Sequence, residues 1–277
     1  MRIAVAMSLS ARRRITEEGV EFRAPEDGTA HFLTPETAMD LQAAFGVDIA
    51  MALDVCPPFP AERAQVEDAS RLTLAWAERS RRAWSGDGLL FGIVQGGTHE
   101  DLRRRCAADL AALDFPGYAI GGVAVGESKE AIREVTALSC TLLPEERPRY
   151  LMGVGTPADL LASVRSGVDL FDCVLPTRNG RMGHAYTGLG EVTIKHERFK
   201  EDLRPLDPAC ACPVCRRHTR AYLRHLFVVK DFSAAMLISI HNVFFYLDWM
   251  RTIRDAIAAE SLGSLQAPPE GKIPEGA

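Results

Sequence analysis

Two groups of residues in this 277-residue sequence have the types and the spacing that chemistry requires. The first is a set of three cysteines within six residues, Cys210, Cys212 and Cys215. Three thiolates in so tight a loop can occupy three corners of a tetrahedral zinc site, with a histidine nitrogen at the fourth corner. The candidates for that fourth ligand are His218, His225 and His241.

These three histidines differ in how easily they can reach the cysteine loop. His218 is cramped beside Cys215, and His225 falls within a basic helix expected at about 214–229. His241 lies on the next expected helix, so a helical hairpin can return it to the loop. We therefore expect one Zn²⁺ per chain, held by Cys210, Cys212, Cys215 and His241. Four protein ligands leave no open position for water, which predicts a structural rather than a catalytic zinc.

The second group consists of polar residues at the ends of short apolar segments. Asp172 ends one such segment, and a carboxylate there can attack an electrophilic sugar carbon, as in retaining glycosidases. Asp54 ends another and could accept hydrogen bonds from a ring N–H and an exocyclic amine. Gln95 and a backbone N–H near Gly122 could donate to a carbonyl oxygen. Together these groups form the donor and acceptor edge that is needed to bind guanine.

These residues belong to a regular alternation of predicted strands and helices. The predicted strands cover about 47–54, 89–95, 117–121, 149–153 and 168–172, with helices at about 61–84, 99–113 and 127–143 between them. Such βα units predict an α/β fold with right-handed connections. Polar residues at the carboxyl ends of several strands favour a (β/α)₈ TIM-type barrel, whereas a doubly wound sheet binds its ligand at one switch point. Five of the eight barrel strands are found.

The alternation breaks after Asp172. Residues 178–189 are rich in glycine and polar side chains, 191–194 is typical of one arm of a hairpin, and helices are expected at about 214–229 and 232–260. The expected domains are a partial barrel at 1–180, a zinc-binding subdomain with C-terminal helices at 181–262, and a disordered tail at 263–277.

Composition and charge exclude some classes of protein. The main apolar stretch, 234–240, is far shorter than the roughly 20 residues of a membrane helix, and 1–7 is too short for a signal peptide. Seven cysteines, an odd number, argue against a disulfide framework, so we expect a cytoplasmic protein. Residues 178–230 contain eleven Lys/Arg and five Asp/Glu, although the whole chain has a net charge of −5. This local excess is what contact with a polyanion requires, and a solvated arginine-rich helix is the alternative.

The sequence strongly resembles the tRNA-guanine transglycosylase family from Met7 to about Ile257. The matching motifs are MSLS at 7–10, MALD at 51–54, FGIVQG at 91–96, GGVAVGE at 121–127, YLMGVG at 150–155, FDCVLPTRNGR at 171–181 and the Cys/Cys/Cys/His set. The resemblance implies a (β/α)₈ barrel with a zinc-binding subdomain inserted near the last strand. By the same resemblance, the N-terminal three barrel strands are missing here.

The resemblance also implies an activity and the residues that carry it out. The family exchanges the wobble guanine of certain tRNA anticodons for a 7-deazaguanine base, which in the bacterial type is 7-aminomethyl-7-deazaguanine, in queuosine biosynthesis. Asp172 then resembles the nucleophile that forms a covalent intermediate with ribose C1′ in a double displacement. The implied base-binding residues are Asp54, Gln95, Gly122, Val123, Tyr150 and Met152, and the implied tRNA contacts are Gly153, Asp159, Thr177, Arg178 and Arg181. A homodimer is implied as well, and the pair Cys56 and Val125 matches the bacterial substrate range.

The start of the sequence departs from the family pattern. Family members have about a hundred residues before the MSLS segment, and these include a second catalytic aspartate, whereas only residues 1–6 precede it here. We therefore expect a transglycosylase chain that does not exchange bases by itself. The alternative is a non-catalytic tRNA-binding or partner subunit. The presence of Asp54, Gln95 and Asp172 favours a catalytic origin.

Overall fold

A computed structural model describes residues 13–24 and 26–274, so the MSLS segment lies outside the described residues. The chain divides into two compact units. The first contains Met1–Gly153 and Ser166–Phe171, and the second contains Val154–Arg165 and Asp172–Ala277. These bounds differ from the domain boundaries that we expected at 180/181 and 262/263, because the segment that follows the last strand of the first unit already packs within the second.

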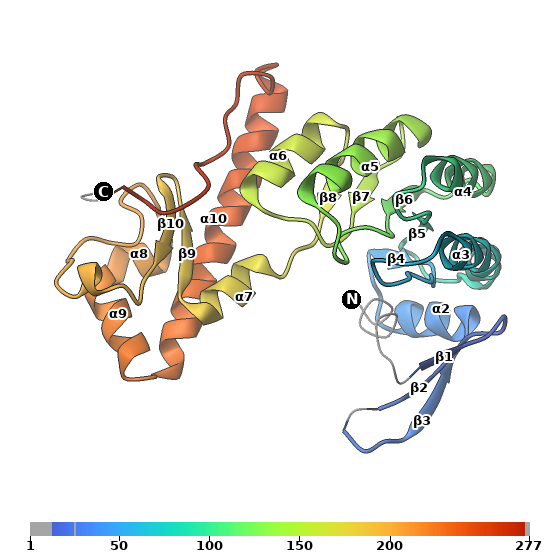
Figure 1. Ribbon diagram of the computed structural model, residues 1–277, viewed down its shortest axis with the longest axis horizontal. Helices are drawn as coiled ribbons and strands as arrows, with labels where there is room; N and C mark the ends of the chain where they lie inside the picture. Colours follow the sequence, from blue (N-terminus) through green and yellow to red (C-terminus); the bar gives the residue numbers. More distant parts are fainter. Residues whose placement is uncertain (1–12, 25, 275–277) are drawn as a thin grey trace. The chain divides into compact units, whose positions relative to one another are not determined.

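The first unit is built on a five-stranded parallel sheet. Its strands are β4 (Ile49–Met51), β5 (Leu89–Val94), β6 (Gly117–Ile120), β7 (Arg149–Leu151) and β8 (Leu170–Phe171), and its helices include α3 (Arg63–Ala83), α4 (Glu100–Ala112) and α5 (Lys129–Leu142). Each strand pairs with the next one along the chain, in the order β4-β5-β6-β7-β8, and the sheet curls (Figure 1). A sequential order without reversal is that of a barrel rather than of a doubly wound sheet. The expected α/β class with five barrel strands is confirmed.

The apolar character of these strands explains where they lie. Phe91, Ile93, Ile120 and Leu151 are all buried, as expected for the inner positions of a parallel sheet that helices cover, whereas Ile49, Leu89 and Leu170 at the amino ends of their strands are exposed. The strands are shorter than predicted because each polar residue at a carboxyl end lies in the turn that follows its strand, as Gln95 does after Val94. The ends of neighbouring strands therefore place their polar residues along one edge of the sheet.

An antiparallel sheet precedes the parallel one and was not predicted. Its strands are β1 (Arg13–Ile15), β2 (Val20–Arg23) and β3 (Ala30–Leu33), in the order β1-β2-β3. The following helix, α2 (Pro35–Ala44), begins after Thr34, because the Thr34 side chain accepts a hydrogen bond from the Thr37 N–H. Two side chains of α3 tie the antiparallel sheet and α2 to the rest of the first unit. The indole of Trp76 donates to the Glu17 carbonyl at 2.9 Å, and Arg79 pairs with Glu36 at 2.7 Å.

The second unit consists of helices and one hairpin. Its elements are α6 (Pro157–Arg165), α7 (Leu175–Met182), β9 (His184–Thr187), β10 (Gly190–Thr193), the short 3₁₀ helix η1 (Glu197–Phe199), α8 (Pro213–Arg217), α9 (Arg220–Val228) and α10 (Phe232–Ala258). The expected hairpin is confirmed by the antiparallel pairing of β9 with β10. Part of the segment 178–189 is helical rather than irregular. The helix expected at 214–229 is two helices, because Thr219 caps α9 by accepting from the Tyr222 N–H.

The segment 263–274, expected to belong to a disordered tail, pairs with the hairpin at residues 271–273. The Glu191 N–H donates to Gly271 O at 2.6 Å, and the Ile273 N–H donates back to Glu191 O at 3.1 Å. Ile273 is only 3% exposed and packs with the core that β9, β10 and α10 share. The expectation was wrong for these residues, because a single apolar side chain with backbone pairing anchors the segment. None of the described helices combines the length and the apolarity that crossing a membrane requires.

Candidate functional site

Three neighbouring strands of the first unit bring predicted base-binding residues together. Asp54 follows β4, Gln95 directly follows β5, and Gly122 lies just after β6. Because these strands are parallel neighbours, the three residues lie at the same edge of the sheet. Asp54 is 6% exposed and Gln95 is 1% exposed. The Gln95 Nε2 donates to Asp54 Oδ2 at 2.7 Å.

Burial changes the acid–base properties of this pair. It raises the pKa of Asp54 to about 6, and the hydrogen bond from Gln95 partly offsets that rise. Among the described residues, nothing donates a hydrogen bond to the buried Gln95 Oε1. A buried carbonyl oxygen without a donor costs free energy, so this edge is suited to a polar ligand that provides one.

Gly122 can only be glycine here. Its φ is +67°, in the left-handed region, and a Cβ at this position would lie 2.5 Å from Gln95 Oε1. The backbone of the β6 turn therefore passes directly beside the Gln95 amide. The next residue, Val123, is buried. A backbone N–H this close to two buried side chains can serve as a fixed hydrogen-bond donor.

The replacement Asp54→Asn is expected to stabilise the protein while it removes base binding. The folded-state pKa of Asp54 is raised above the ordinary aspartate value of 3.8, so the carboxylate lowers stability progressively as the pH rises from about 4 to 6. The neutral amide should raise the free energy of unfolding at pH 7 by on the order of 2 kcal/mol. It should also abolish guanine binding. Thermal unfolding and guanine titrations from pH 5 to 8 measure both effects. The affinity of the wild-type chain for guanine should decrease when the pH is lowered below about 6.

The matched control for this variant is Asp48→Asn. Asp48 is an exposed carboxylate just before β4, at the opposite end of the same strand. The Asp48→Asn variant should have the wild-type stability at pH 7 and the wild-type affinity for guanine. A pH-independent affinity in the wild-type chain would contradict the role of Asp54.

The loops after β4 and β6 each contain one further residue that the resemblance implies, Cys56 and Val125. Cys56 is buried, and its pKa is raised to about 12 first by burial and then by the charges of Asp54 and Glu127. The thiol is therefore protonated and inert at neutral pH. Val125 is half-buried, and its N–H donates to Glu127 Oε2 at 2.9 Å. Both loops begin at the strand ends that carry Asp54 and Gly122, which together with Gln95 form what we call the predicted base-binding edge.

Tyr150, Met152 and Gly153 lie on and after the next strand, β7. Tyr150 is paired with Ala119 of β6 on one side and Leu170 of β8 on the other. The Met152 N–H donates to Ile120 O at 3.3 Å, so Met152 extends the pairing of β7 with β6 by one residue. All three predicted residues are half-buried. Tyr150 lies within the strand, whereas Met152 and Gly153 follow it.

The remaining predicted residues belong to the second unit. Asp172 is half-buried and directly follows β8. Arg178 and Arg181 are exposed on α7, and Thr177 of the same helix is half-buried. Gly180 on the opposite side of α7 packs so closely on α10 that a Cβ would lie 2.5 Å from Ser239 Oγ. This packing leaves the two arginines on the outer face of the helix.

Asp159 has a structural partner that the sequence did not indicate. It is buried in the first turn of α6, where its Oδ2 accepts from Thr156 Oγ1 at 2.6 Å. Its own N–H donates back to Thr156 Oγ1 at 3.2 Å. This reciprocal pair caps the helix, so contact of Asp159 with tRNA stays a prediction.

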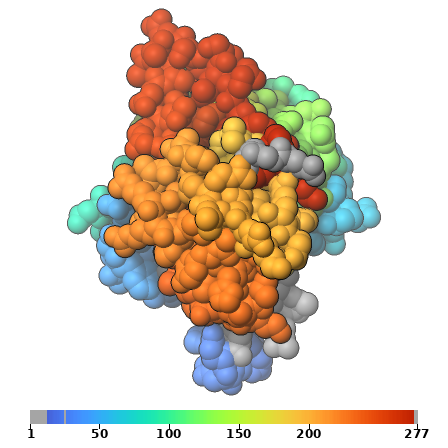
Figure 2. Space-filling view, turned by 90° about the vertical axis from the view of Figure 1, so that its left-hand side faces the viewer, coloured from blue at the N-terminus to red at the C-terminus, as the bar shows by residue number. Residues whose placement is uncertain are grey.

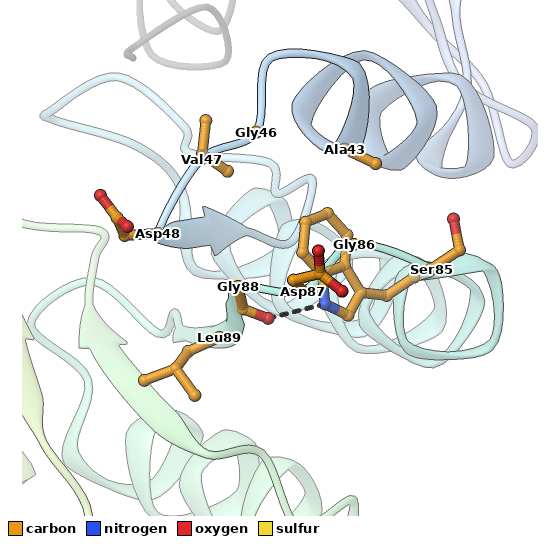
Figure 3. A pocket seen from close by; sticks show the side chains of 10 residues that line it. Ala43, Gly46, Val47, Asp48, Ser85, Gly86, Asp87, Gly88 and Leu89 are labelled. Carbon is orange, nitrogen blue, oxygen red and sulfur yellow. Dashed lines mark hydrogen bonds between the residues drawn. The ribbon is translucent and has the colours of Figure 1, made fainter.

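A cavity of about 420 Å³ lies elsewhere in the first unit. Figure 3 shows its lining at the amino ends of β4 and β5, where the Trp84 indole donates to Gly88 O at 3.0 Å. Asp48 and Asp87 lie at its rim. Because Asp54 and Gln95 follow the opposite ends of the same strands, this cavity is separate from the base-binding edge.

The second unit brings the four predicted metal ligands together. The donor atoms of Cys210, Cys212, Cys215 and His241 all lie within 4.8 Å of one another. The distances from His241 Nδ1 to the three sulfurs are 3.8, 3.5 and 3.4 Å. Zinc–sulfur and zinc–nitrogen bonds of about 2.3 Å and 2.0 Å at tetrahedral angles separate the two donors by about 3.5 Å. The four residues therefore fit a metal ion of this size and geometry.

The surroundings of His241 support its assignment as the fourth ligand. Its ring is fully buried, and Nε2 donates to Tyr186 O at 2.8 Å. That hydrogen bond leaves Nδ1 as the nitrogen that faces the sulfurs. The competing candidates lie apart from the cluster, since His218 stacks on Tyr222 and His225 is exposed on α9.

Segment 184–230, which carries most of the basic excess, forms a continuous face of the second unit (Figure 2).

One residue near the base-binding edge was missed by the sequence analysis. Arg103 on α4 is 0% exposed and donates to Gly121 O at 2.7 Å and to Gly97 O at 2.6 Å. A signal was present, because Arg103 shares the helical spacing of the buried Cys106, Ala107 and Leu110. An arginine on the apolar face of an amphipathic helix requires internal hydrogen-bond partners.

Comparison with known proteins gives a consistent result. A family model described as "Queuine tRNA-ribosyltransferase" matches residues 3–268. A protein of that name from Thermoanaerobacter pseudethanolicus is 49% identical over 257 residues, which cover 92% of this chain and 68% of the relative. One from Acidithiobacillus ferrooxidans is 51% identical, covering 92% of this chain and 69% of the relative. One from Cereibacter sphaeroides is 50% identical, covering 94% and 70%.

Proposed function

Because this chain belongs to the queuine tRNA-ribosyltransferase family, we propose that it is a tRNA-guanine transglycosylase chain. It exchanges the wobble guanine of queuosine-family tRNAs for 7-aminomethyl-7-deazaguanine. The observation that carries the proposal is the buried Asp54–Gln95 pair beside the Gly122 backbone. The carboxylate accepts from the ring N–H and the amine of guanine, while Gln95 and the Gly122 N–H donate to its carbonyl oxygen. Tyr150, Met152 and Val123 complete the base-binding site.

In the proposed mechanism, Asp172 attacks ribose C1′ as the carbon–nitrogen bond to guanine breaks. The wobble base must leave the anticodon stack to reach Asp54 and Gln95, at a cost of a few kcal/mol. The new carbon–oxygen bond forms a covalent enzyme–tRNA intermediate, and guanine leaves with the bonding electron pair and takes up a proton. The incoming base then displaces Asp172 and loses a proton, so two inversions retain the configuration.

The proposed tRNA contacts lie in the second unit. Arg178 and Arg181 are exposed on α7, and their charges suit phosphate oxygens. The resemblance adds Gly153, Asp159 and Thr177, and it also supports a homodimer, which light scattering on the purified protein would measure. We place the protein in the cytoplasm, where its tRNA substrate is found.

The proposed cofactor is one structural Zn²⁺ held by Cys210, Cys212, Cys215 and His241. A closed set of three thiolates and one imidazole suits zinc and leaves it no open position. When bound, the ion cross-links the cysteine loop to α10. No step of base exchange passes through it.

Incorporation of radiolabelled guanine into tRNA tests the proposed function. The substrates are a tRNA with guanine at the wobble position and the same tRNA with adenine there. The assay uses the 277-residue chain and a second form that includes any residues encoded in frame upstream of Met1. Label should enter only the first tRNA, and it should do so with the longer form, because the 277-residue chain is not expected to exchange bases by itself. Tight tRNA binding without incorporation by either form would contradict the proposal and favour a non-catalytic tRNA-binding subunit.

The identity of the incoming base gives a separate prediction. Cys56 and Val125 belong to the loops after β4 and β6, and the resemblance links this pair to the bacterial substrate range. We expect 7-aminomethyl-7-deazaguanine to be incorporated, and queuine, with its bulky cyclopentenediol, to react at least tenfold more slowly, because overpacking costs typically 1–3 kcal/mol. Competition between the two bases against labelled guanine measures this. Equal competition by queuine would contradict the prediction.

A further inference from the structure

Arg103 is a fully buried cation whose hydrogen bonds run to backbone carbonyl oxygens and a hydroxyl. Its Nη2 donates to Gly121 O at 2.7 Å, its Nε donates to Gly97 O at 2.6 Å, and its Nη1 lies 3.4 Å from Ser139 Oγ. Burial lowers the pKa of this guanidinium to about 10, so it remains charged at neutral pH. A buried charge of this kind is costly. The positions of its hydrogen-bond partners indicate which part of the fold this buried charge stabilises.

The two carbonyl oxygens belong to the turns that follow β5 and β6. Gly97 lies two residues after Gln95, and Gly121 directly precedes Gly122. The positive φ values of Gly97 (+55°) and Gly122 (+67°) mark both segments as turns. One planar guanidinium therefore joins the turn that carries Gln95 to the turn that carries the Gly122 N–H. The Gly121 N–H extends the pairing of β6 with β5 by donating to Val94 O at 3.0 Å, and Arg103 then holds the Gly121 carbonyl and joins it to the turn after β5.

The hydrogen bond to Gly121 O also acts on the Gly122 N–H directly. These two groups belong to the same planar trans peptide unit, in which C=O and N–H point in opposite directions. Holding the oxygen on the Arg103 side therefore aims the N–H away from α4. A charge-assisted hydrogen bond to the carbonyl also polarises the peptide unit, which makes its N–H a stronger donor. The position of a Gly122 Cβ, 3.4 Å from Nη2, shows how close the cation lies to this peptide.

We propose that Arg103 is a positioning residue that orients and polarises the Gly121–Gly122 peptide and thereby sets selectivity for a base with a carbonyl oxygen. This inference rests on the proposed function, since the proposed ligand of the Gly122 N–H is the guanine carbonyl. Arg103 itself does not touch the base. Lysine cannot replace it, because a single ammonium lacks the planar fork that spans Gly97 O and Gly121 O.

The test compares guanine with 6-thioguanine, in which sulfur, a weak acceptor, replaces only the carbonyl oxygen. Equilibrium affinities of both bases are measured on the full 277-residue chain and on Arg103→Met and Arg103→Lys. Wild type should prefer guanine. Both variants should bind guanine about tenfold more weakly, the loss expected for one hydrogen bond. Their affinity for 6-thioguanine should change less than threefold, so the preference for guanine should shrink.

Arg149→Met is the matched control. Arg149 is a second buried arginine in the same unit that donates to carbonyl oxygens, Gly167 O at 3.2 Å and Leu143 O at 3.1 Å. The Arg149→Met variant should have a lower melting temperature but the same ratio of guanine affinity to 6-thioguanine affinity as wild type. An unchanged ratio in the Arg103 variants, or an equal change in Arg149→Met, would overturn the inference. Loss of folding in both Arg103 variants would also overturn the inference, because it would show that Arg103 stabilises the whole fold rather than positioning one peptide. Failure of wild type to bind guanine would instead overturn the proposed function.

Discussion

In the longer form of the chain used for the exchange assay, Asp172→Asn is expected to abolish the covalent enzyme–tRNA adduct and to lower guanine exchange by a factor on the order of 10⁴ to 10⁶. The amide keeps the shape of the side chain but removes the nucleophilic oxygen, so the carbon–oxygen bond to ribose cannot form. Its position directly after β8 motivates the choice. The adduct is measured as a band that persists in denaturing gels after incubation of protein with tRNA.

Asp169→Asn provides the control for this prediction. Asp169 is an exposed aspartate that precedes β8, and its carboxylate accepts from the Arg149 N–H at 2.8 Å. This variant should keep the adduct and lose only some stability. A covalent band in Asp172→Asn of wild-type intensity would show that another residue is the nucleophile, whereas tRNA binding should be retained in both variants.

The second large effect is expected from loss of the metal ligand His241. His241→Ala should reduce bound zinc from about one per chain to a small fraction, because three thiolates alone leave the tetrahedral site incomplete. The second unit should lose several kcal/mol of stability, since the free energy of metal binding is part of its folding free energy. Its core residues pack around the cysteines themselves, and Cys212 and Cys215 belong to that core. Elemental analysis and thermal unfolding with and without a chelator measure the two effects.

His218→Ala and His225→Ala are the matched controls. Both histidines were plausible ligands from their distance along the chain, and both should keep full zinc content. Full zinc occupancy in His241→Ala would contradict the assignment. A wild-type melting temperature that a chelator does not lower would contradict the structural role of the metal.

Local patterns in the sequence determined most of the first unit. Short apolar segments that alternate with amphipathic segments predict the βα units. A buried strand requires a run of apolar residues, and a helix with one face on the sheet and one in solvent requires apolar residues at the helical period. The cap of α2 at Thr34 and the cysteine loop are also local, since each depends on residues within a few positions of one another. Pairing of β1 to β3 was missed. Those strands are only three or four residues long, and their alternation is too brief to distinguish from a loop.

Contacts between distant residues were decided by the tertiary structure alone. The sequence favoured His241 over His218 and His225, but only the packing of α10 beside the hairpin brings His241 Nδ1 to the sulfurs and Nε2 to Tyr186 O. The order of Ile273 depends likewise on its pairing with Glu191. Spacing along the chain limits which residues can meet, but the distances and hydrogen bonds between them depend on how the elements pack.

The chemistry of the base-binding edge shows the same division. The residue types and strand ends in the sequence predict that Asp54 and Gln95 share one edge of the sheet. The 2.7 Å hydrogen bond between them, the pKa of about 6 for Asp54 and the buried guanidinium of Arg103 could not be read from it. These properties depend on how completely water is excluded and on which dipoles face each group. Solvent exclusion is a property of all the surrounding atoms together, so only the folded structure determines it.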